Sequence, residues 1–560
     1  MSFLLRRLVT TSLALGLAQL PPVSLADTPD QELIRQQERE KAQRERLEAL
    51  PALRLPPPET GGGADWPADE TPCFPIHTVR LDGEQAERFR RALAAIGDPA
   101  GRCLGALGIA AAARRVQQAI ASDGYVTTRV LVGAQHLDTG ILTLTVLPGR
   151  LRAIRDETAS RLRPAHRNAI PVRPGDLLNL RDIEQGLENL KRVPSTEAAL
   201  RIEPAEQPGI SDLVLSGNEA FPYRLTLSAD DGGSRSTGRY QGTVTLSIDN
   251  LLTLSDLFYF STGRSLGGDG GPRHGTRNSA VHYSLPFGYW LLGANASDYD
   301  YFQTVASPVP GRVYRGNSRN AQLSLSRVLL RSAERKTTLA LRGWRRQSSN
   351  HVDDNAMASQ RRRTAGWELS LGQRVHLAGS LLEGTLTWRR GTGAFNALPA
   401  PGQRLGEEDA RGGFLRADLG LTLPFSWPGQ RWRYAGTLRG QWSDVALTPQ
   451  DRFAIGGRYS VRGFDGELSL TGERGWLIRN ELGLSPGGGS QELYLGLDHG
   501  RVGGPSARRL LGRELSGAVI GWRGGSSRLN WDLFAGWPLR KPTGFRTART
   551  TGGFSINSSF

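Results

Sequence analysis

The sequence predicts a transmembrane antiparallel β-barrel of sixteen strands, preceded by two small α+β modules and an N-terminal helix. From Gly217 onward the 560-residue chain consists of segments in which apolar and polar residues alternate. The connections between these segments alternate between short turns and long polar loops. After residue 20 no apolar run is long enough for a membrane-spanning helix. This criterion does not detect barrel strands, because the alternation of apolar and polar residues makes them polar on average.

Composition and charge exclude several other classes of protein. The chain is 38% hydrophobic with a mean hydropathy of -0.37, too apolar for a disordered chain and too polar for a helical membrane protein. The net charge is +16, and only four of the 70 basic residues are lysines, so 66 are arginines. Such a surplus can indicate nucleic-acid binding. These arginines are scattered singly through alternating segments, so we expect them to coat a lumen and loops, with no nucleic-acid partner.

Residues 1–26 have the pattern of a secretory signal peptide. Two arginines give a positive start, Leu8–Leu20 form the apolar stretch, and Ser24-Leu25-Ala26 fits a small-x-small cleavage site. The alternative is a short buried helix. A cleaved signal places the mature chain outside the cytoplasm, where Cys73 and Cys103 are able to form a disulfide.

Residues 27–52 are predicted to form a helix with charged residues on every side. Gln31–Leu50 is rich in Glu, Gln and Arg, which are strong helix formers, and it has no wide apolar face. Such a helix either crosses water or sits in a polar channel. A solvated arm and a plug therefore both remain open. Residues 53–72 follow as a linker, since they contain three consecutive prolines and three consecutive glycines.

Two small mixed modules are predicted next, at residues 73–150 and 151–217. The elements expected in the first are a strand, two helices and two strands, at Thr78–Leu81, Gln85–Ala95, Ala110–Ser122, Thr127–Val132 and Ile141–Leu147. The elements expected in the shorter second module are a strand, a helix and a strand, at Leu151–Asp156, Leu180–Val193 and Ala199–Pro204. Cys73 and Cys103 bracket half of the first module, and their spacing excludes a CxxC metal or redox site.

Residues 218–560 are predicted to form the barrel. One face of each segment is apolar with aromatic ends and the other is polar and often carries arginine, as in Tyr240–Asn250, which places lipid outside and water inside. The strands are expected to begin near residues 221, 239, 255, 278, 289, 318, 335, 361, 379, 413, 430, 475, 490, 513, 526 and 552. Short turns such as Leu251–Thr253 alternate with long loops such as Val445–Arg474. A soluble β-propeller or sandwich would not produce this alternation.

The chain ends on an amphipathic strand that closes with an aromatic residue. Phe554, Ile556 and Phe560 form this ending, which is similar to the terminal signature of outer-membrane barrels. We expect it to act as the signal for barrel assembly.

Motifs for catalysis are weak. Gly263–Gly267 matches G-x-S-x-G, but that motif needs a strand-to-helix turn, whereas a glycine-rich loop follows here. The eight histidines are dispersed, and neither HExxH nor a Walker A sequence is present. We therefore expect no enzyme activity, no cofactor and no metal site.

The chain resembles the outer-membrane transporters of two-partner secretion (TpsB, the haemolysin secretion/activation proteins) over nearly all of its mature length. The motifs that carry the resemblance are Cys73–Ile76, Gly101–Gly105, Gly124–Val130, Arg181–Asn189, Gly209–Leu213, Phe453–Phe464 and Arg479–Leu482. No single motif is decisive, but their order and spacing together make the resemblance specific.

The resemblance implies two polypeptide-transport-associated (POTRA) modules in the periplasm, a sixteen-stranded barrel in the outer membrane and an N-terminal helix that plugs the pore. It also implies a secreted exoprotein partner of the haemolysin, adhesin or contact-dependent toxin type, which would cross the barrel unfolded. Outer-membrane lipids, periplasmic chaperones and the barrel-assembly machinery are further expected partners. Activation of the exoprotein during passage stays open. An insertase for other barrel proteins is the alternative function.

The resemblance finally implies a loop motif inside the barrel, Val461-Arg462-Gly463-Phe464. By sequence alone this segment could be a surface turn. In the family the loop folds back into the lumen and its arginine meets an acidic residue of the inner wall, for which Asp498 is the best candidate. Alternation places Asp498 and Gly496 on the lumen side, although the family often has an aromatic residue where this chain has Gly496. The planar guanidinium of Arg462 suits a carboxylate, which it can bind through two parallel hydrogen bonds.

Overall fold

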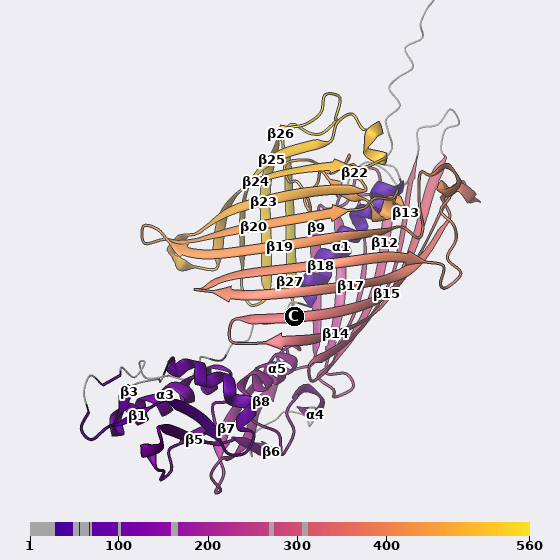
Figure 1. Ribbon diagram of the computed structural model, residues 1–560. Helices are drawn as coiled ribbons and strands as arrows, with labels where there is room; N and C mark the ends of the chain where they lie inside the picture. The colour runs from indigo at the N-terminus through magenta and orange to yellow at the C-terminus, as the bar shows by residue number, and fades with distance from the viewer. Residues whose placement is uncertain are drawn as a thin grey trace, which may run out of the picture.

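The computed structural model describes residues 29–48, 55, 66–67, 70–98, 102–157, 166–267, 274–304 and 312–560. The predicted signal peptide and most of the predicted linker lie outside these residues. Figure 1 shows helix α1 (Pro29–Leu47) inside a large barrel, with two small modules at one end of it. None of the helices in the described segments is long and apolar enough to span a membrane.

The barrel is closed and antiparallel, and its wall has the predicted sixteen strands. They are β9 (Tyr223–Asp230), β10 (Gln241–Asp249), β11 (Leu257–Ser265), β12 (Gly275–Phe287), β13 (Trp290–Thr304), β14 (Val313–Arg331), β15 (Arg335–Val352), β17 (Arg362–Leu377), β18 (Ser380–Thr392), β19 (Gly413–Ser426), β20 (Arg431–Trp442), β23 (Arg474–Ser485), β24 (Gln491–Gly503), β25 (Glu514–Gly525), β26 (Leu529–Arg540) and β27 (Thr551–Ser559). The short β16 (Asn355–Ala356) only extends β15. Strand β27 pairs with β9 and closes the wall.

The two faces of the barrel wall differ as alternation requires. On the outward face of β20, Trp432 and Trp442 lie at opposite ends with the exposed Leu438 between them. Ten residues of tilted strand rise about 25 Å, the height of the apolar band of an outer-membrane barrel. On the inward face, Arg439 donates a hydrogen bond from Nε to Asp418 Oδ1 at 2.7 Å. The wall therefore presents apolar side chains outside and paired charges inside.

The first module (residues 74–147) contains a two-stranded sheet and a three-stranded sheet of order β2-β5-β4. Its elements are β1 (Phe74–Ile76), β2 (Thr78–Asp82), α2 (Ala86–Phe89), the 3₁₀ helix η1 (Arg90–Ile96), β3 (Arg102–Leu104), α3 (Ala106–Ser122), β4 (Arg129–Leu131), η2 (Leu137–Thr139) and β5 (Ile141–Leu147). The helix expected at 85–95 is thus largely 3₁₀. Phe89 of α2 and Ala92 and Ile96 of η1 are buried in the core of the module. A disulfide joins Cys73 to Cys103.

The second module (residues 150–219) has a three-stranded sheet of order β6-β8-β7. Its elements are β6 (Arg150–Asp156), α4 (His166–Ala169), α5 (Leu180–Leu190), β7 (Thr196–Pro204) and β8 (Ile210–Glu219). Strand β8 was not predicted. It is the central strand, and its apolar run Leu213-Val214-Leu215 is buried on both faces, so it lacks the alternation that identifies half-exposed strands.

The second module is fixed to the barrel through α5, which is buried on nearly every side. Asn189 donates from Nδ2 to the carbonyl of Gly288, in the turn between β12 and β13, at 2.7 Å. Arg331 Nη1 donates to Glu188 at 2.8 Å, and Lys336 bonds to the same carboxylate. Burial alone would raise the pKa of Glu188, but Lys336 and Arg331 outweigh it and hold that pKa below its usual value. The turn between β14 and β15 thereby holds the module in place.

Part of the predicted linker contacts the first module. Glu70 accepts hydrogen bonds from the backbone N–H groups of Gly105, Leu107 and Gly108 at 2.7–2.8 Å, at the N-terminus of α3. Desolvation opposes ionisation of Glu70, yet these three donors lower its pKa. A carboxylate at this end of a helix is favourable because the N–H groups there have no intrahelical partners.

We expect the disulfide to stabilise the first module without affecting the barrel. Cys73→Ser combined with Cys103→Ser should lower the stability of the first module by about 2–4 kcal/mol, because the bridge closes a loop in the unfolded chain. Limited proteolysis of the full protein should then cut within residues 74–147 sooner than in the parent. Reductant should reproduce this cleavage in the parent and do nothing further in the double variant. Unchanged cleavage kinetics would contradict the prediction.

Candidate functional site

The connection between β20 and β23, residues 443–473, folds back into the lumen. It contains the short helix η5 (Pro449–Asp451) and a small hairpin, β21 (Phe453–Ile455) and β22 (Leu470–Gly472). An apolar cluster holds this loop against the inner wall; its members are Phe453, Ile455, Val461, Phe464, Leu470, Leu477, Val502, Ala507, Leu515 and Phe545. Leu477, Val502 and Leu515 belong to β23, β24 and β25. The sequence motif thus occupies the lumen rather than the surface.

Arg462 lies at the centre of this contact and is only 6% exposed. Its Nε and Nη2 donate to the two carboxylate oxygens of Asp498 at 2.8 and 2.9 Å, and its backbone N–H donates to Asp498 Oδ2 at 2.9 Å. Its Nη1 donates to Glu481 Oε2 at 2.6 Å. The structure therefore brings together Arg462 and Asp498, and adds a second carboxylate.

Two glycines make this approach possible. Gly463 has a φ of +93°, and a Cβ there would lie 2.4 Å from the carbonyl oxygen of Trp537. Gly496 lies beside the guanidinium, and a Cβ there would lie 2.5 Å from Arg462 Nη2. The absence of a side chain at Gly496, where the family often has an aromatic residue, therefore leaves room for Arg462.

The N-terminal part of the loop contacts the barrel wall at a second place. Asp451 Oδ1 forms ion pairs at 3.2 Å with Arg346 of β15 and with Arg389 of β18. The guanidinium of Arg389 also lies 3.9 Å from the ring centroid of Trp344, a cation–π contact. The loop is thus attached to β15 and β18 at one end and to β23 and β24 at its tip.

Helix α1 fills much of the remaining lumen. Polar contacts join it to strands all round the wall, through the pairs Asp30–Arg362, Glu32–Tyr299, Arg39–Asp230, Lys41–Asp418, Gln43–Ser261 and Arg46–Asn557. Its Leu33 packs against Tyr299, Tyr301 and Tyr314, a contact that the lack of a wide apolar face did not predict. The helix is a plug, as the resemblance implied, and a cavity of about 480 Å³ remains beside its second half.

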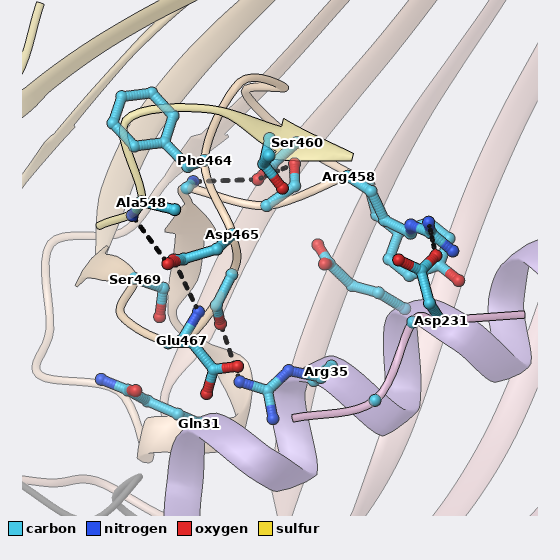
Figure 2. Close-up of a pocket in the computed structure, with 18 of the residues that line it drawn as sticks. Gln31, Arg35, Asp231, Arg458, Ser460, Phe464, Asp465, Glu467, Ser469 and Ala548 are labelled. Carbon is cyan, nitrogen blue, oxygen red and sulfur yellow. Dashed lines mark hydrogen bonds and ion pairs between the residues drawn. The ribbon is translucent and has the colours of Figure 1, made fainter. Parts of the chain in front are cut away.

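The plug and the loop meet at the C-terminal end of β9. Arg35 of the plug donates from Nη2 to the carbonyl of Gly466 in the loop at 2.7 Å. Arg39 of the plug binds Asp230, and Arg458 of the loop binds the adjacent Asp231. Figure 2 shows Arg35, Arg458 and Asp231 around the cavity of about 130 Å³ that separates helix and loop. Movement of either segment would therefore disturb the other.

Asp231 also ties this junction to the seam of the barrel. The backbone N–H of Phe554 in β27 donates to Asp231 Oδ1 at 2.9 Å, and Arg239 donates to Oδ2 at 3.0 Å. At the other end of the seam, the backbones of Leu225 and Phe560 exchange hydrogen bonds at 3.1 and 2.9 Å. Ile556 faces outward and is exposed. The three C-terminal residues singled out in the sequence thus lie along the closing strand pair.

Sequence reasoning missed Glu481, Asp451 and Asp231. Glu481 belongs to the motif Arg479–Leu482, where alternation with Leu482 would have placed it on the lumen side. Asp451 and Asp231 lie in or beside loops, where no periodic pattern assigns a direction to a side chain. Ser265, in the G-x-S-x-G match, ends the barrel strand β11 and is followed by another strand, β12.

The two modules differ in how accessible their helix–strand edges are. In the first module, the side chain of Gln117 in α3 occupies the outer edge of β4: Nε2 donates to the carbonyl of Thr128 at 2.7 Å, and Oε1 accepts from the N–H of Val130 at 2.8 Å. The neighbouring Leu131 and Val132 are 49% and 44% exposed. The corresponding helix of the second module is covered by barrel turns. The first module therefore presents, beside α3, an edge that an incoming strand could reach.

Comparisons with known proteins place the chain in a family. The family described as Haemolysin secretion/activation protein ShlB/FhaC/HecB matches residues 209–524. The POTRA domain of ShlB type matches residues 74–149, and a second POTRA domain family matches 150–204. The resemblance drawn from the sequence is thereby confirmed, and the two modules are POTRA domains.

Curated relatives and solved structures agree over almost the whole chain. Outer membrane transporter CdiB-2 of Burkholderia pseudomallei is 37% identical over 544 residues, covering 94% of this chain and 93% of the relative. Outer membrane transporter CdiB of Dickeya dadantii is 28% identical, with 93% and 92% covered. The structure of CdiB from Acinetobacter baumannii has a TM-score of 0.82 at 30% identity, with 95% and 99% covered, and CdiB from Escherichia coli has 0.81 at 28%, with 95% and 98% covered.

The barrel therefore lies in the outer membrane, with the POTRA domains on its periplasmic side. A wall plugged by a helix and a folded-back loop, the POTRA domains, and the agreement in sequence along nearly the full length lead to one conclusion: the chain belongs to the haemolysin secretion/activation protein family ShlB/FhaC/HecB, and it is an outer-membrane transporter.

Proposed function

We propose that this transporter exports one large exoprotein in unfolded form, and that its first POTRA domain recognises that client. The observation that carries the proposal is the content of the lumen. A helix and a loop, neither of which belongs to the wall, obstruct it through polar contacts. A passive porin keeps a water-filled channel open. A pore that is blocked by segments held through polar contacts can be cleared when a large client has to pass.

We base client recognition on the outer edge of β4 in the first POTRA domain, which a side chain rather than another strand occupies. The Gln117 carboxamide bonds to Thr128 and Val130 as the backbone of an added strand would. A client segment in extended conformation could displace this side chain and take over both bonds, with Leu131 and Val132 available to its apolar side chains. Pairing of this kind gives affinity with little demand on client sequence. The second POTRA domain then acts as a fixed base, because α5 is held by the barrel.

Passage requires the plug and the loop to leave the path. Their shared junction at Asp230 and Asp231 makes displacement of one weaken the hold of the other. No nucleotide is available outside the cytoplasm, so direction would come from folding of the client outside the cell. Refolded chain cannot slip back through the pore.

Deletion of the chain is the general test of this function. One large exoprotein should disappear from the medium while other outer-membrane barrels assemble at normal levels. General loss of barrel proteins would instead establish the alternative function of an insertase.

We expect the first POTRA domain to lose its client when the β4 edge is made acidic. Leu131→Asp combined with Val132→Asp should reduce secretion several-fold, because the apolar contacts beside the edge are lost while the exposed positions tolerate charge. The matched control is Thr78→Asp on β2, the opposite edge of the same sheet, which should secrete normally. Equal secretion by both variants would remove the β4 edge from the proposal.

We expect removal of the plug to open the pore. Deletion of residues 29–48 should raise single-channel conductance in planar bilayers and spare secretion, because the helix blocks ions and makes no lasting contact with the client. Glu45→Ala, at a position whose side chain is 64% exposed, should leave conductance unchanged and serves as the control. Unchanged conductance in the deletion variant would show that the helix does not close the channel.

We expect Arg462 to be needed for export and not for insertion. Arg462→Ala should cut secretion roughly tenfold or more, since breaking a buried ion pair costs about 3–5 kcal/mol, whereas the sixteen-stranded wall should remain heat-modifiable on gels. Asp498→Asn should cost less, because Glu481 still pairs with the guanidinium. Arg479→Ala removes a lumen arginine that belongs to the wall and lies 3.8 Å from Asp498; as the control it should secrete nearly normally. An equal loss in Arg479→Ala would show that lumen charge, rather than the loop contact, matters.

A further inference from the structure

Three arginines on the outer wall of the barrel are without acidic partners. Arg345 of β15, Arg363 of β17 and Arg390 of β18 form no ion pair within the described part of the chain. Arg345 and Arg390 are exposed. Arg363 is half-buried, and its Nε is buried with no hydrogen-bond partner in that same part of the chain. A buried donor without a partner is costly unless a ligand or water completes it.

Alternation shows that all three side chains leave the barrel. Their chain neighbours Trp344, Arg362 and Arg389 face the lumen, where Arg362 binds Asp30 of the plug and Arg389 pairs with Asp451 of the loop. Successive residues of a strand point to opposite faces. The three guanidinium groups therefore face the membrane or the space just above it.

The strand register fixes the height at which the cluster of Arg345, Arg363 and Arg390 lies on the barrel wall. Leu341, Leu369 and Trp388 stand in one cross-strand row. The next row toward the extracellular side contains Gly343, Trp367 and Arg390, and the row after it contains Arg345 and Ala365. Apolar side chains thus give way to tryptophan and then to arginine. Trp367 and Trp388 mark the membrane interface, since aromatic residues gather there in outer-membrane barrels.

One outward arginine beside the cluster does have an acidic partner. Arg319 of β14, Gln347 and Arg363 share a row. Arg319 also faces outward, but its Nε donates to Asp298 Oδ1 at 2.9 Å. Arg345 and Arg363 lie in neighbouring rows of the adjacent strands β15 and β17, and Arg390 lies on the next strand, β18, so positive charge gathers on this part of the wall. A bound anion would balance these charges and give Arg363 Nε a hydrogen-bond acceptor.

Space for a ligand is present at the lower edge of the cluster, in the row that contains Arg390. Gly343 lies directly across from Trp367, and a Cβ at Gly343 would have nothing within 4 Å. A polar group can therefore approach the wall beside the Trp367 ring, with Arg390 in the same row and Arg345 in the row above. Below this row, Leu341, Leu369 and Leu371 are exposed and offer an apolar surface for acyl chains.

We propose that Arg345, Arg363 and Arg390 bind the phosphate groups of the phosphorylated glycolipid that forms the outer leaflet of the outer membrane. Guanidinium groups bind phosphate through paired hydrogen bonds. The cluster lies at the height where the lipid A phosphates meet the acyl region, and the apolar rows below accept the chains. A free phosphate would share the first interaction but not the second.

The test measures binding of lipid A to the purified full-length protein in detergent. Bisphosphorylated lipid A should raise the melting temperature of the parent, whereas dephosphorylated lipid A and inorganic phosphate at the same concentration should not. In the variant Arg345→Gln, Arg363→Gln and Arg390→Gln, the apparent affinity for lipid A should fall on the order of a hundredfold, by the usual contribution of each basic residue at a charged lipid surface. Native mass spectrometry should show fewer retained lipid A molecules.

The matched control is Arg319→Gln, which removes an outward arginine at the same height that already has a carboxylate partner. It should bind lipid A like the parent. Heat-modifiability on gels establishes that each variant is folded, and Arg390→Gln alone, at an exposed position, should already weaken binding. Equal affinity of the triple variant and the parent would overturn the proposal. So would a full melting-temperature shift by inorganic phosphate, which would make this an anion site rather than a lipid site.

Discussion

A guanidinium taken out of water is stable only while carboxylates surround it, and Arg462 has two, Asp498 and Glu481. That requirement fixes the tip of the long loop against β23 and β24, and the apolar cluster around Val461 and Phe464 follows. The position of the plug depends on it in turn, because Arg35 binds the carbonyl of Gly466 beyond the motif. The obstruction of the pore is thus one connected arrangement.

The division of labour between the two POTRA domains has a similar physical origin. Buried carboxylates on α5 need the basic groups that the turn between β14 and β15 supplies, so the second domain cannot leave the barrel without exposing unpaired charge. The first domain has no such ion pairs with the barrel among the described residues. Its edge is closed only by the Gln117 carboxamide, which an incoming backbone can replace bond for bond. A fixed base beside an accessible edge would deliver a client to the mouth of the pore.

The sequence predicted the parts of the molecule that repeat and missed those that depend on three-dimensional placement. Alternation located all sixteen strands, because barrel strands are exposed to two different solvents. It failed at β8, whose residues 213–215 are apolar without a break because both faces are buried. Alternation along a strand gave Asp498 its direction toward the lumen, and the same reasoning applies to Glu481. Asp451 and Asp231 lie in or beside loops, where no alternating pattern predicts the direction of a side chain. The contact between plug and loop joins residues more than 400 positions apart, Arg35 and Gly466, and no local pattern encodes it.

Locking the plug in place tests the central claim that the lumen must clear before export. Gln43 donates to Ser261 of β11 at 3.1 Å, and the chain has no free cysteine. Gln43→Cys combined with Ser261→Cys can be joined in intact cells by a short thiol-cleavable cross-linker, with the unmodified chain treated identically as the control. We expect secretion to stop on cross-linking and to return when the linker is cleaved, while the control secretes throughout. Undiminished secretion with the plug fully cross-linked would contradict this account.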